Sequence, residues 1–348
     1  TPVALAAGLN KAARNHILIR DTSALEQMRN VDVVVFDKTG TLTEGHPTVI
    51  GWLWAQGQEE HYKDVLLAAE STSDHPLAEA IVTALEGEEQ VIPAHLDGFE
   101  NITGKGVRVV YQGAEYWVGS HKLLKDYQAN LSDILADMLT QYESDGNSIV
   151  YFGRENDLLA VIAIKDQLRV TSMEAIRELR IQDIEICMLT GDGERTASSV
   201  AGSLGIMRFV ADAMPDDKED FIHKLQLQGK TVAMVGDGVN DAQALSCADV
   251  SIAMGKGTDT LMDTAMITLR TSDLLLLPKV FRLSRQTVSL MYRNLFWAFI
   301  YNTVGIFVAA GVLYPVYDIL LSPALAGAAM ALSCVSVALS SLRLSSRF

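Results

Sequence analysis

Cysteine is scarce in this chain of 348 residues: it has three, Cys187, Cys247 and Cys334, which lie far apart. None of them forms a pair with the spacing of metal ligands, and so few separated thiols suit a reducing compartment such as the cytosol. Positive charge is also deficient, and the net charge of −15 argues against a nucleic-acid partner. The chain is therefore expected to have neither a cysteine-based metal-binding module nor a nucleic-acid interface.

The sequence also lacks the pattern G-x-x-x-x-G-K-[ST], internal repeats and low-complexity tracts. Without that pattern, a bound nucleotide cannot have its phosphates held by a P-loop. About 280 residues precede the first long charge-free run, which is enough for two domains of ordinary size.

One octet carries most of the chemistry. Residues 36–43 read Phe-Asp-Lys-Thr-Gly-Thr-Leu-Thr and follow the valine-rich run 31–35, which predicts a buried strand. Asp37 should therefore lie at the carboxyl end of a strand, where ligands bind in open α/β sheets. A carboxylate there, followed by Lys38 and the Thr39 hydroxyl, suits a nucleophile that accepts a phosphoryl group, because aspartyl phosphate is a known covalent intermediate.

Two further apolar runs end in polar motifs. Residues 184–189 lead into Thr190, Gly191 and Asp192, and residues 231–235 lead into a second aspartate-rich turn. Between them, Pro215 is expected at a first helical position, three residues before Lys218. The predicted catalytic residues are Asp37, Lys38, Thr39, Thr190, Gly191, Asp192, Lys218, Asn240 and Asp241.

Each motif has a task in phosphoryl transfer, which depends mostly on positioning and charge neutralisation. Asp37 attacks, while Thr190 and Lys218 hold the phosphoryl oxygens. Mg²⁺, which prefers one or two carboxylates together with waters and phosphate oxygens, would be held by Asp37, Thr39 and Asp237. Asn240 and Asp241 would orient that end of the site, as their position in the last turn indicates.

The four motifs, in this order, resemble those of the P-type ATPases over essentially the whole chain. The resemblance implies a haloacid-dehalogenase-like Rossmannoid phosphorylation domain of the α/β class. Hydrolases of that superfamily usually carry a second Asp two residues after the nucleophile, where this chain has Thr39. Without that acid/base the aspartyl phosphate should persist, as a transport cycle requires, which weakens the alternative of a soluble phosphatase.

The motif pattern stops after Gly45 and resumes with the apolar run 158–164. About 110 residues intervene, too many for a loop within a compact domain, and they show strand and helix patterns of their own. The sequence therefore predicts an inserted α+β domain over 46–158, with hinges near Glu44-Gly45 and Lys165-Asp166.

This insert is expected to bind ATP. A histidine beside a proline can stack on or bond to a purine, and glycines let the backbone approach a ligand closely. The predicted nucleotide residues are Glu70, His75, Gly104, Gly106 and Gly119. The first four resemble, position for position, the nucleotide site of heavy-metal (type IB) P-type ATPases, with Asp74 in place of the commoner Glu.

The end of the chain is predicted to form a transmembrane hairpin. Residues 295–314 and 319–342 are 20 and 24 residues without a charge, and about 20 apolar residues cross a bilayer. Arginines flank the pair (Arg282, Arg285, Arg293, Arg343, Arg347), whereas the turn 315–318 has no Lys or Arg. By the positive-inside rule, both ends and the catalytic domains are cytoplasmic.

Polar and soft residues in these spans suggest a transported ion, since such groups are costly in lipid. They are Tyr301, Asn302, Met330, Ser333 and Cys334, with no Asp, Glu, His or Lys in either span. Thioether, thiolate and neutral oxygen ligands favour Cu(I). The Tyr-Asn pair and Met-x-x-Ser resemble copper-exporting members, while Cys334 at the next position leaves Cu(I) and Ag(I) both open.

The resemblance implies that the chain is the C-terminal half of a copper-type pump. The Cys-Pro-Cys helix, the actuator domain and the earlier membrane helices are missing, so ATP binding and phosphoryl transfer can survive but transport by this chain alone is not expected. A truncated nucleotide-binding remnant is the non-enzymatic alternative. The expected parts are a membrane-helix end and stalk (1–26), the phosphorylation domain (27–45 and 159–275), the insert (46–158), a stalk (276–294), two transmembrane helices (295–342) and a cytoplasmic tail (343–348).

Overall fold

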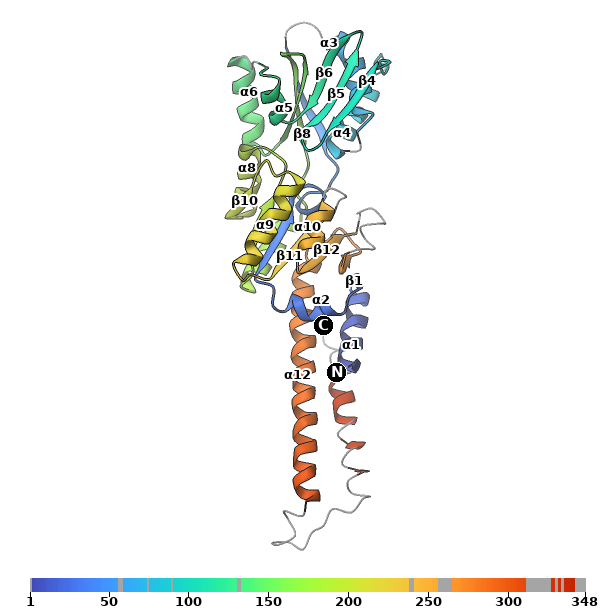
Figure 1. Cartoon of the computed structure of the whole chain (residues 1–348), viewed down its shortest axis with the longest axis vertical. Helices are drawn as coiled ribbons and strands as arrows, with labels where there is room; N and C mark the ends of the chain where they lie inside the picture. The colour runs from blue at the N-terminus through green and yellow to red at the C-terminus, as the bar shows by residue number, and fades with distance from the viewer. Residues whose placement is uncertain are drawn as a thin grey trace.

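The computed structural model contains two β-sheets stacked along its long axis, with the long helix α12 (Leu276–Ala309) extending from one end (Figure 1). The seven-stranded sheet with its helices is called the core domain, and the six-stranded sheet with its helices is called the inserted domain. The structure describes residues 2–55, 59–73, 75–88, 90–129, 133–237, 241–255, 265–310, 327–328, 331–332 and 335–341.

The core domain is built on a seven-stranded sheet of order β1-β13-β12-β11-β2-β9-β10, parallel except for the edge strand β1. Strands β2, β11 and β12 are buried along their whole length, which explains their mostly apolar sequences. The strand bounds are β1 Ile17–Ile19, β2 Val33–Asp37, β9 Glu185–Leu189, β10 Arg208–Val210, β11 Val232–Gly236, β12 Val250–Met254 and β13 Ile267–Leu269.

Helices cover both faces of this sheet. On one face α2, α7, α8 and the start of α12 enclose a core that contains Phe36 and Met188, and on the other α9 and α10 pack over Val35 and Met234. The helix bounds are α2 Ser23–Met28, α7 Ser172–Ile181, α8 Glu194–Leu204, α9 Pro215–Leu227 and α10 Ala242–Cys247. Pro215 begins α9 as predicted. This is the predicted α/β Rossmannoid arrangement.

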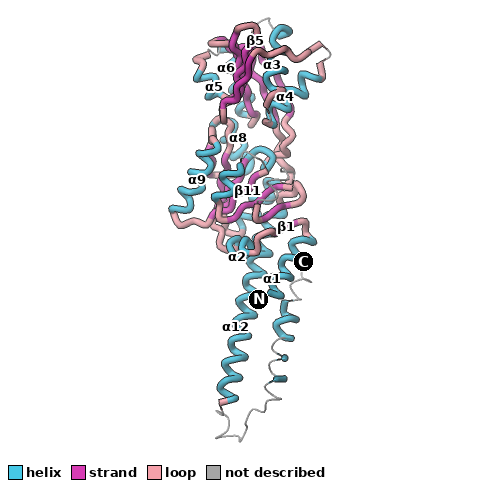
Figure 2. Tube along the Cα trace, turned by 45° about the vertical axis from the view of Figure 1, so that its right-hand side comes forward, coloured by secondary structure: helices cyan, strands magenta, loops and turns pink. Residues whose placement is uncertain are grey.

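The inserted domain lies at the end of the molecule opposite α12 (Figure 2). It contains an antiparallel six-stranded sheet of order β3-β8-β7-β6-β5-β4. Its strands are β3 Thr48–Trp54, β4 Gly98–Ile102, β5 Gly106–Tyr111, β6 Ala114–Gly119, β7 Ser148–Arg154 and β8 Asp157–Lys165. Helices α3 (Glu59–Glu70) and α4 (Pro76–Glu86) pack on one face, and α5 (His121–Asp126) and α6 (Asp133–Ser144) on the other.

Two predicted boundaries are wrong. The apolar run 158–164 was expected to return the chain to the core domain, but β8 pairs with β3 and β7 in the inserted sheet. The run is apolar because Ile162 and Val161 face helices on opposite sides of that sheet. Likewise, 1–26 is not only a membrane-helix end and stalk, because β1 (Ile17–Ile19) pairs antiparallel with β13 at the edge of the core sheet.

The N-terminal helix α1 (Pro2–Arg14) packs against α12. Gly8 permits the close approach, since a Cβ there would lie 2.7 Å from Thr287 Oγ1. Farther along α12, Asn294 Nδ2 donates to Ser341 Oγ at 3.0 Å, which brings the described helical segment 335–341 against α12. The predicted stalk 276–294 is thus the first half of α12, continuous with the start of the first expected span.

Within the described residues the predicted transmembrane hairpin is not found, because no helix there combines the length and the apolar character needed to cross a bilayer. Most of the second expected span, 319–342, lies outside the described residues.

Candidate active site

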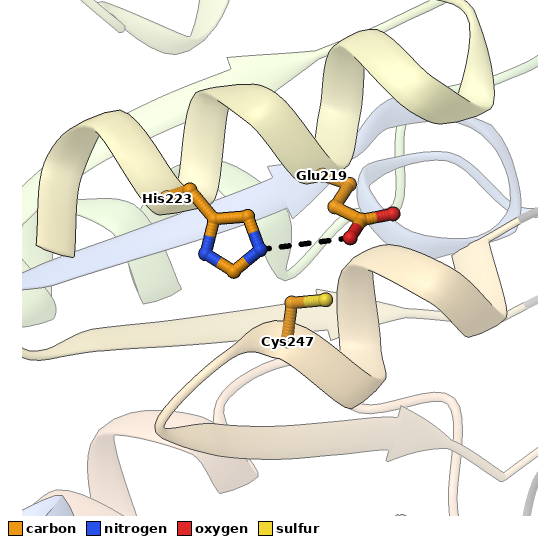
Figure 3. Close-up of side chains that lie close together, drawn as sticks. All are labelled: Glu219, His223 and Cys247. Atoms are coloured by element: carbon orange, nitrogen blue, oxygen red, sulfur yellow. Dashed lines mark ion pairs between the residues drawn. The ribbon is translucent and has the colours of Figure 1, made fainter.

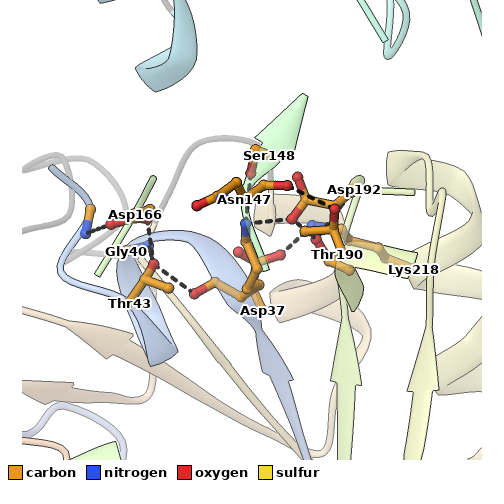
Figure 4. Close-up of polar contacts among 12 residues, drawn as sticks. Asp37, Gly40, Thr43, Asn147, Ser148, Asp166, Thr190, Asp192 and Lys218 are labelled. Carbon is orange, nitrogen blue, oxygen red and sulfur yellow. Dashed lines mark hydrogen bonds and ion pairs between the residues drawn. The ribbon is translucent and has the colours of Figure 1, made fainter. Parts of the chain in front are cut away.

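Asp37 is the last residue of β2, an interior strand of the core sheet between β11 and β9. Its neighbours β9 and β11 run parallel to β2, so the turns that follow all three strands meet at one edge. Figure 4 shows Thr190, Asp192 and Lys218 gathered around Asp37 at this edge. The prediction that these separate motifs form one site agrees with this geometry.

Lys218 joins two of the predicted carboxylates. Its Nζ lies 2.5 Å from Asp37 Oδ1 and 2.7 Å from Asp241 Oδ1, and all three residues are buried. Burial lowers the pKa of Lys218, but the two carboxylates outweigh burial and raise that pKa overall. Lys218 is therefore a fixed ammonium next to the nucleophile.

Three carboxylates converge on the same point. Oxygens of Asp37, Asp237 and Asp241 lie within 4.8 Å of one another. Burial and then the charge of Asp37 raise the pKa values of Asp237 and Asp241 to about 7. Three carboxylates this close repel one another, and the single ammonium of Lys218 does not balance their combined negative charge. Their oxygen donors fit a hard divalent cation such as Mg²⁺.

The turn after Asp37 depends on glycine. Gly40 has φ of +70°, and a Cβ there would lie 1.4 Å from Asp237 Oδ2, so a side chain would displace the carboxylate. Arg169 secures the turn from the other side: its Nε donates to Thr41 O at 2.9 Å and its other guanidinium nitrogen donates to Gly40 O. The octet thus places Asp37 rigidly and leaves room for Asp237.

Lys38 points away from the nucleophile toward the inserted domain. Its Nζ forms an ion pair with Asp192 and donates to Ser148 Oγ at 3.1 Å. Burial raises the pKa of Asp192, but the Lys38 ammonium outweighs burial and lowers it overall. Thr190 Oγ1 also donates to Asp192, at 3.0 Å. Asp192, predicted among the catalytic residues without a specific role, anchors Lys38 through its carboxylate.

Asp166 secures the hinge between the two domains. Its Oδ2 accepts from Thr43 Oγ1 at 2.5 Å and its Oδ1 accepts from Gly45 N at 3.1 Å. The chain leaves the core domain at Thr43–Gly45 and returns at Asp166, so one side chain links both crossings (Figure 4). The sequence located the hinges but not this bond, nor the roles of Arg169 and Ser148. The polar residues at the two predicted hinges, Thr43 and Asp166, were the sequence feature that could have indicated this bond.

Helix α8 of the core domain also contacts the inserted domain. Thr196 Oγ1 donates to Asn147 O at 2.8 Å, and Ser199 Oγ donates to Ser144 O at 2.7 Å. On the other side, Lys122 Nζ donates to Asp212 O at 2.6 Å. The inserted domain is therefore docked on the edge of the core sheet that carries Asp37.

His75 faces this edge from the inserted domain. It caps α4, where its Nδ1 accepts from Leu77 N at 3.2 Å. The residue is exposed, yet desolvation by the surrounding protein lowers its pKa, while Asp192 raises that pKa and Lys38 lowers it by smaller amounts. These influences place the predicted nucleotide residue His75 within electrostatic range of the predicted catalytic residues.

Glu70 is a buried acid at the end of α3. Burial raises the pKa of its carboxyl from 4.5 to about 7. Close packing also requires glycine at two of the predicted positions. A Cβ on Gly106 would lie 2.1 Å from Val118 O, and one on Gly119 would lie 2.1 Å from Lys105 O. At Gly104 a Cβ would meet Met214 of the core domain at 2.7 Å. The assignment of these residues to a nucleotide site stays a prediction.

The buried Glu70 makes stability depend on pH. Between pH values of about 4.5 and 7 the folded state keeps a proton that the unfolded state releases, so the free energy of unfolding falls as pH rises through this window. At 1.36 kcal/mol per pKa unit, Glu70 alone contributes up to about 3 kcal/mol. We expect Glu70→Gln to remove this part of the pH dependence in urea unfolding. Glu79→Gln, at an exposed position of α4, should leave the dependence unchanged; equal slopes for both variants would contradict the prediction.

The predicted transport residues are only partly visible. Tyr301 stacks on Trp297, with ring centroids 5.8 Å apart, and Asn302 Nδ2 donates to Ala298 O at 2.8 Å. Met330, Ser333 and Cys334 lie outside the described residues, as do Asn240 of the catalytic set and Asp74. No geometry therefore bears on the predicted copper ligands as a set.

The sequence that forms this site matches a known protein family. Residues 31–249, which hold every predicted catalytic residue, match the model of the haloacid dehalogenase-like hydrolase family. The chain belongs to this family. In such a hydrolase-like fold the nucleophile is expected at the end of the central strand, where Asp37 lies.

Within the family, this haloacid dehalogenase-like chain is similar to metal pumps. It is 42% identical over 344 residues to a copper-exporting P-type ATPase of Legionella pneumophila, and 43% identical over 349 residues to a silver-exporting P-type ATPase of Salmonella typhimurium. Both matches cover 99% of the chain but only 46% and 42% of the relatives. The chain thus spans less than half the length of these relatives.

Solved structures point the same way. A zinc-transporting PIB-type ATPase in the E2.Pi state matches 99% of this chain and 55% of its own, at 34% identity and a TM-score of 0.67. The catalytic domain of the CPx-ATPase CopB-B matches 78% of this chain and 97% of its own, at 28% identity and a TM-score of 0.65. The resemblance to heavy-metal P-type ATPases is confirmed for the fold of both domains.

Proposed function

We propose that the chain is the C-terminal, catalytic portion of an ATP-driven P-type pump for a soft monovalent metal ion, and that it forms an aspartyl phosphate at Asp37. The observation that carries this proposal is the Lys218 ammonium between Asp37 and Asp241, at the end of the central strand. The similarity to copper- and silver-exporting P-type ATPases supports the reaction class.

In the proposed step, an oxygen of the ionised Asp37 attacks the γ-phosphorus of ATP. The bond between that phosphorus and the bridging oxygen breaks, and ADP leaves with the electron pair. No proton needs to move, because the nucleophile is already a carboxylate beside Lys218. Lys218 and Thr190 would stabilise the equatorial oxygens of the transferring phosphoryl group. Stabilising the negative charge on these oxygens is the main catalytic requirement of phosphoryl transfer.

Asp37, Asp237 and Asp241 would hold Mg²⁺, which when bound neutralises phosphoryl charge. The shared negative charge of these three residues supports this assignment. Thr39, also predicted to contribute to this ion, directly follows Lys38 in the same turn. The inserted domain would supply ATP through Glu70, His75, Gly104, Gly106 and Gly119. The electrostatic influence of Asp192 and Lys38 on the pKa of His75 supports this assignment.

The residue two positions after Asp37 separates a pump from a phosphatase. Thr39 offers no carboxylate to activate water, so the aspartyl phosphate should be long-lived. A soluble phosphatase would instead turn over small phosphate esters. Chain incubated with Mg²⁺ and γ-labelled ATP should give an acid-stable, hydroxylamine-sensitive label and no turnover of a small ester; ester turnover without label would contradict the proposal.

Thr39→Asp should convert the site toward hydrolysis. General acid/base catalysis contributes about 10²- to 10⁴-fold, so we expect the phosphoenzyme lifetime to fall by at least about tenfold in a chase with unlabelled ATP. Thr39→Asn matches the size of the new side chain without its basicity and should keep the lifetime near the parent value. Equal lifetimes for the Asp and Asn variants would contradict this role for Thr39.

We propose Cu(I) as the transported ion, with Ag(I) as the other candidate. Tyr301, Asn302, Met330, Ser333 and Cys334 offer soft and neutral ligands that suit a monovalent soft ion. The proposed setting is a multi-pass membrane protein with cytoplasmic catalytic domains, assembled with the N-terminal half of the pump and its actuator domain. Cu(I) or Ag(I) should stimulate ATP hydrolysis by the complete pump; stimulation by Zn²⁺ alone would contradict the assignment.

A further inference from the structure

A second group of metal-ligating side chains lies on the core domain, separate from the carboxylates around Asp37 (Figure 3). Glu219 and His223 are four residues apart on α9, so they share one face of that helix, and Cys247 is the last residue of α10. A carboxylate oxygen, an imidazole nitrogen and the thiol sulfur lie within 4.8 Å of one another.

The spacing fits one small ion. His223 Nε2 lies 3.5 Å from Glu219 Oε1. Nitrogen and oxygen ligands at about 2.1 Å from a tetrahedral zinc ion are about 3.4 Å apart, so these two atoms already have the required separation. Both side chains are accessible from solvent, at 51% and 36% exposure, so an ion can enter without opening the fold.

The imidazole is oriented as a metal ligand usually is. His223 Nδ1 lies 3.1 Å from Gln226 Oε1, an acceptor, which places the ring proton on Nδ1 and leaves the Nε2 lone pair facing Glu219. Gln226 is fixed in turn, because its Nε2 donates to Cys247 O at 2.9 Å. One glutamine therefore orients the histidine and contacts the backbone of the cysteine ligand.

We propose that Glu219, His223 and Cys247 bind a zinc-class divalent cation, with water in the fourth position. Carboxylate, imidazole and thiolate are the three protein ligand types that Zn²⁺ accepts. Cu(I) favours soft thiolate and thioether ligands, and a carboxylate in the set selects against it. This site is therefore distinct in chemistry from the proposed transport ligands and independent of the proposed phosphoryl transfer.

An ion here would link the two helices that carry active-site residues. Glu219 follows Lys218 on α9, and α10 begins at Ala242, directly after Asp241. Lys218 and Asp241 form an ion pair, so a bound ion would add a second link between the two helices next to these residues in the sequence. The cation is a structural link beside the site rather than a part of the reaction.

The test is zinc binding by the full chain in excess Mg²⁺, which occupies the carboxylate site. Zn²⁺ affinity is measured against a chromogenic chelator, and Co²⁺ serves as a spectroscopic probe for a thiolate-to-metal charge-transfer band. The variants are Cys247→Ser and His223→Gln. Their matched controls are Cys187→Ala, at a buried thiol, and His95→Gln.

We expect one Zn²⁺ per chain and a Co²⁺ thiolate band. Loss of outer partners alone weakens metal sites by about 10- to 100-fold, so loss of a ligand in Cys247→Ser or His223→Gln should cost about 100-fold or more. Zn²⁺ should also raise the thermal unfolding temperature of the parent and the controls but not of His223→Gln. A band that survives Cys247→Ser, a band lost in Cys187→Ala, or no Zn²⁺ binding would overturn the proposal. If Cys247→Ser fails to fold, the exposed His223→Gln variant decides.

Discussion

Asp37→Asn should abolish phosphoenzyme formation while ATP still binds. The amide has the size of the carboxylate but no nucleophilic oxygen, and the other buried carboxylate beside Lys218, Asp241, is already engaged with its ammonium. Nucleotide affinity should be equal or better, because the variant removes a negative charge that faces the triphosphate. Acid-quenched labelling with γ-labelled ATP, and ATP binding measured in parallel, give the two readouts.

Asp220→Asn is the matched control for this experiment. Asp220 is exposed on α9, so its variant makes the same chemical change outside the site and should label as the parent does. Label that persists at the parent level in Asp37→Asn would show that another group is phosphorylated. Loss of both label and ATP binding would indicate misfolding, which circular dichroism detects.

Lys218→Ala should have the second-largest effect, on both rate and stability. Removing one group that stabilises transition-state charge costs about 10²- to 10³-fold, and we expect a loss of that size in the rate of phosphoenzyme formation. Removal also leaves the buried carboxylates of Asp37 and Asp241 without their shared ammonium, and breaking a buried pair in this way costs about 3–5 kcal/mol. Quench-flow labelling and urea unfolding measure the two effects.

Two substitutions control for the loss of a lysine. Lys218→Arg keeps the charge and should retain most of the stability, although the guanidinium cannot reproduce both short contacts and the rate should fall. Lys224→Ala, on the exposed face of the same helix, should change neither quantity. If Lys218→Ala labelled at the parent rate, Lys218 would be a structural ion-pair partner only.

The core sheet could be predicted closely where local and tertiary preferences agree. The runs that became β2, β11 and β12 are mostly apolar because interior parallel strands are buried on both faces, and polar residues mark the points where the strands end. Chain order and turn chemistry alone therefore placed Asp37, Asp237 and Thr190 at one edge.

Other features depend on contacts that no local pattern carries. Strand β8 has the apolar sequence of a parallel core strand but lies in an antiparallel sheet covered on both faces, so the domain assignment from periodicity failed. The three-residue edge strand β1 pairs with β13, in a register that joins Ile19 to Ile267. Strand β10 at the other edge also has only three residues, so neither strand gives a clear local pattern. The bond from Lys38 to Ser148 spans 110 residues and arises only when the domains dock.

Borohydride reduction of the acid-quenched phosphoenzyme tests the central claim most directly. Reduction of an acyl phosphate converts the modified aspartate to homoserine, and peptide mass spectrometry then identifies the position. If Asp37 is the phosphorylated residue, we expect homoserine at position 37, and its formation should depend on both Mg²⁺ and ATP. Homoserine at Asp237 or Asp241, or phosphate retained on a serine or threonine with Asp37 unmodified, would contradict it.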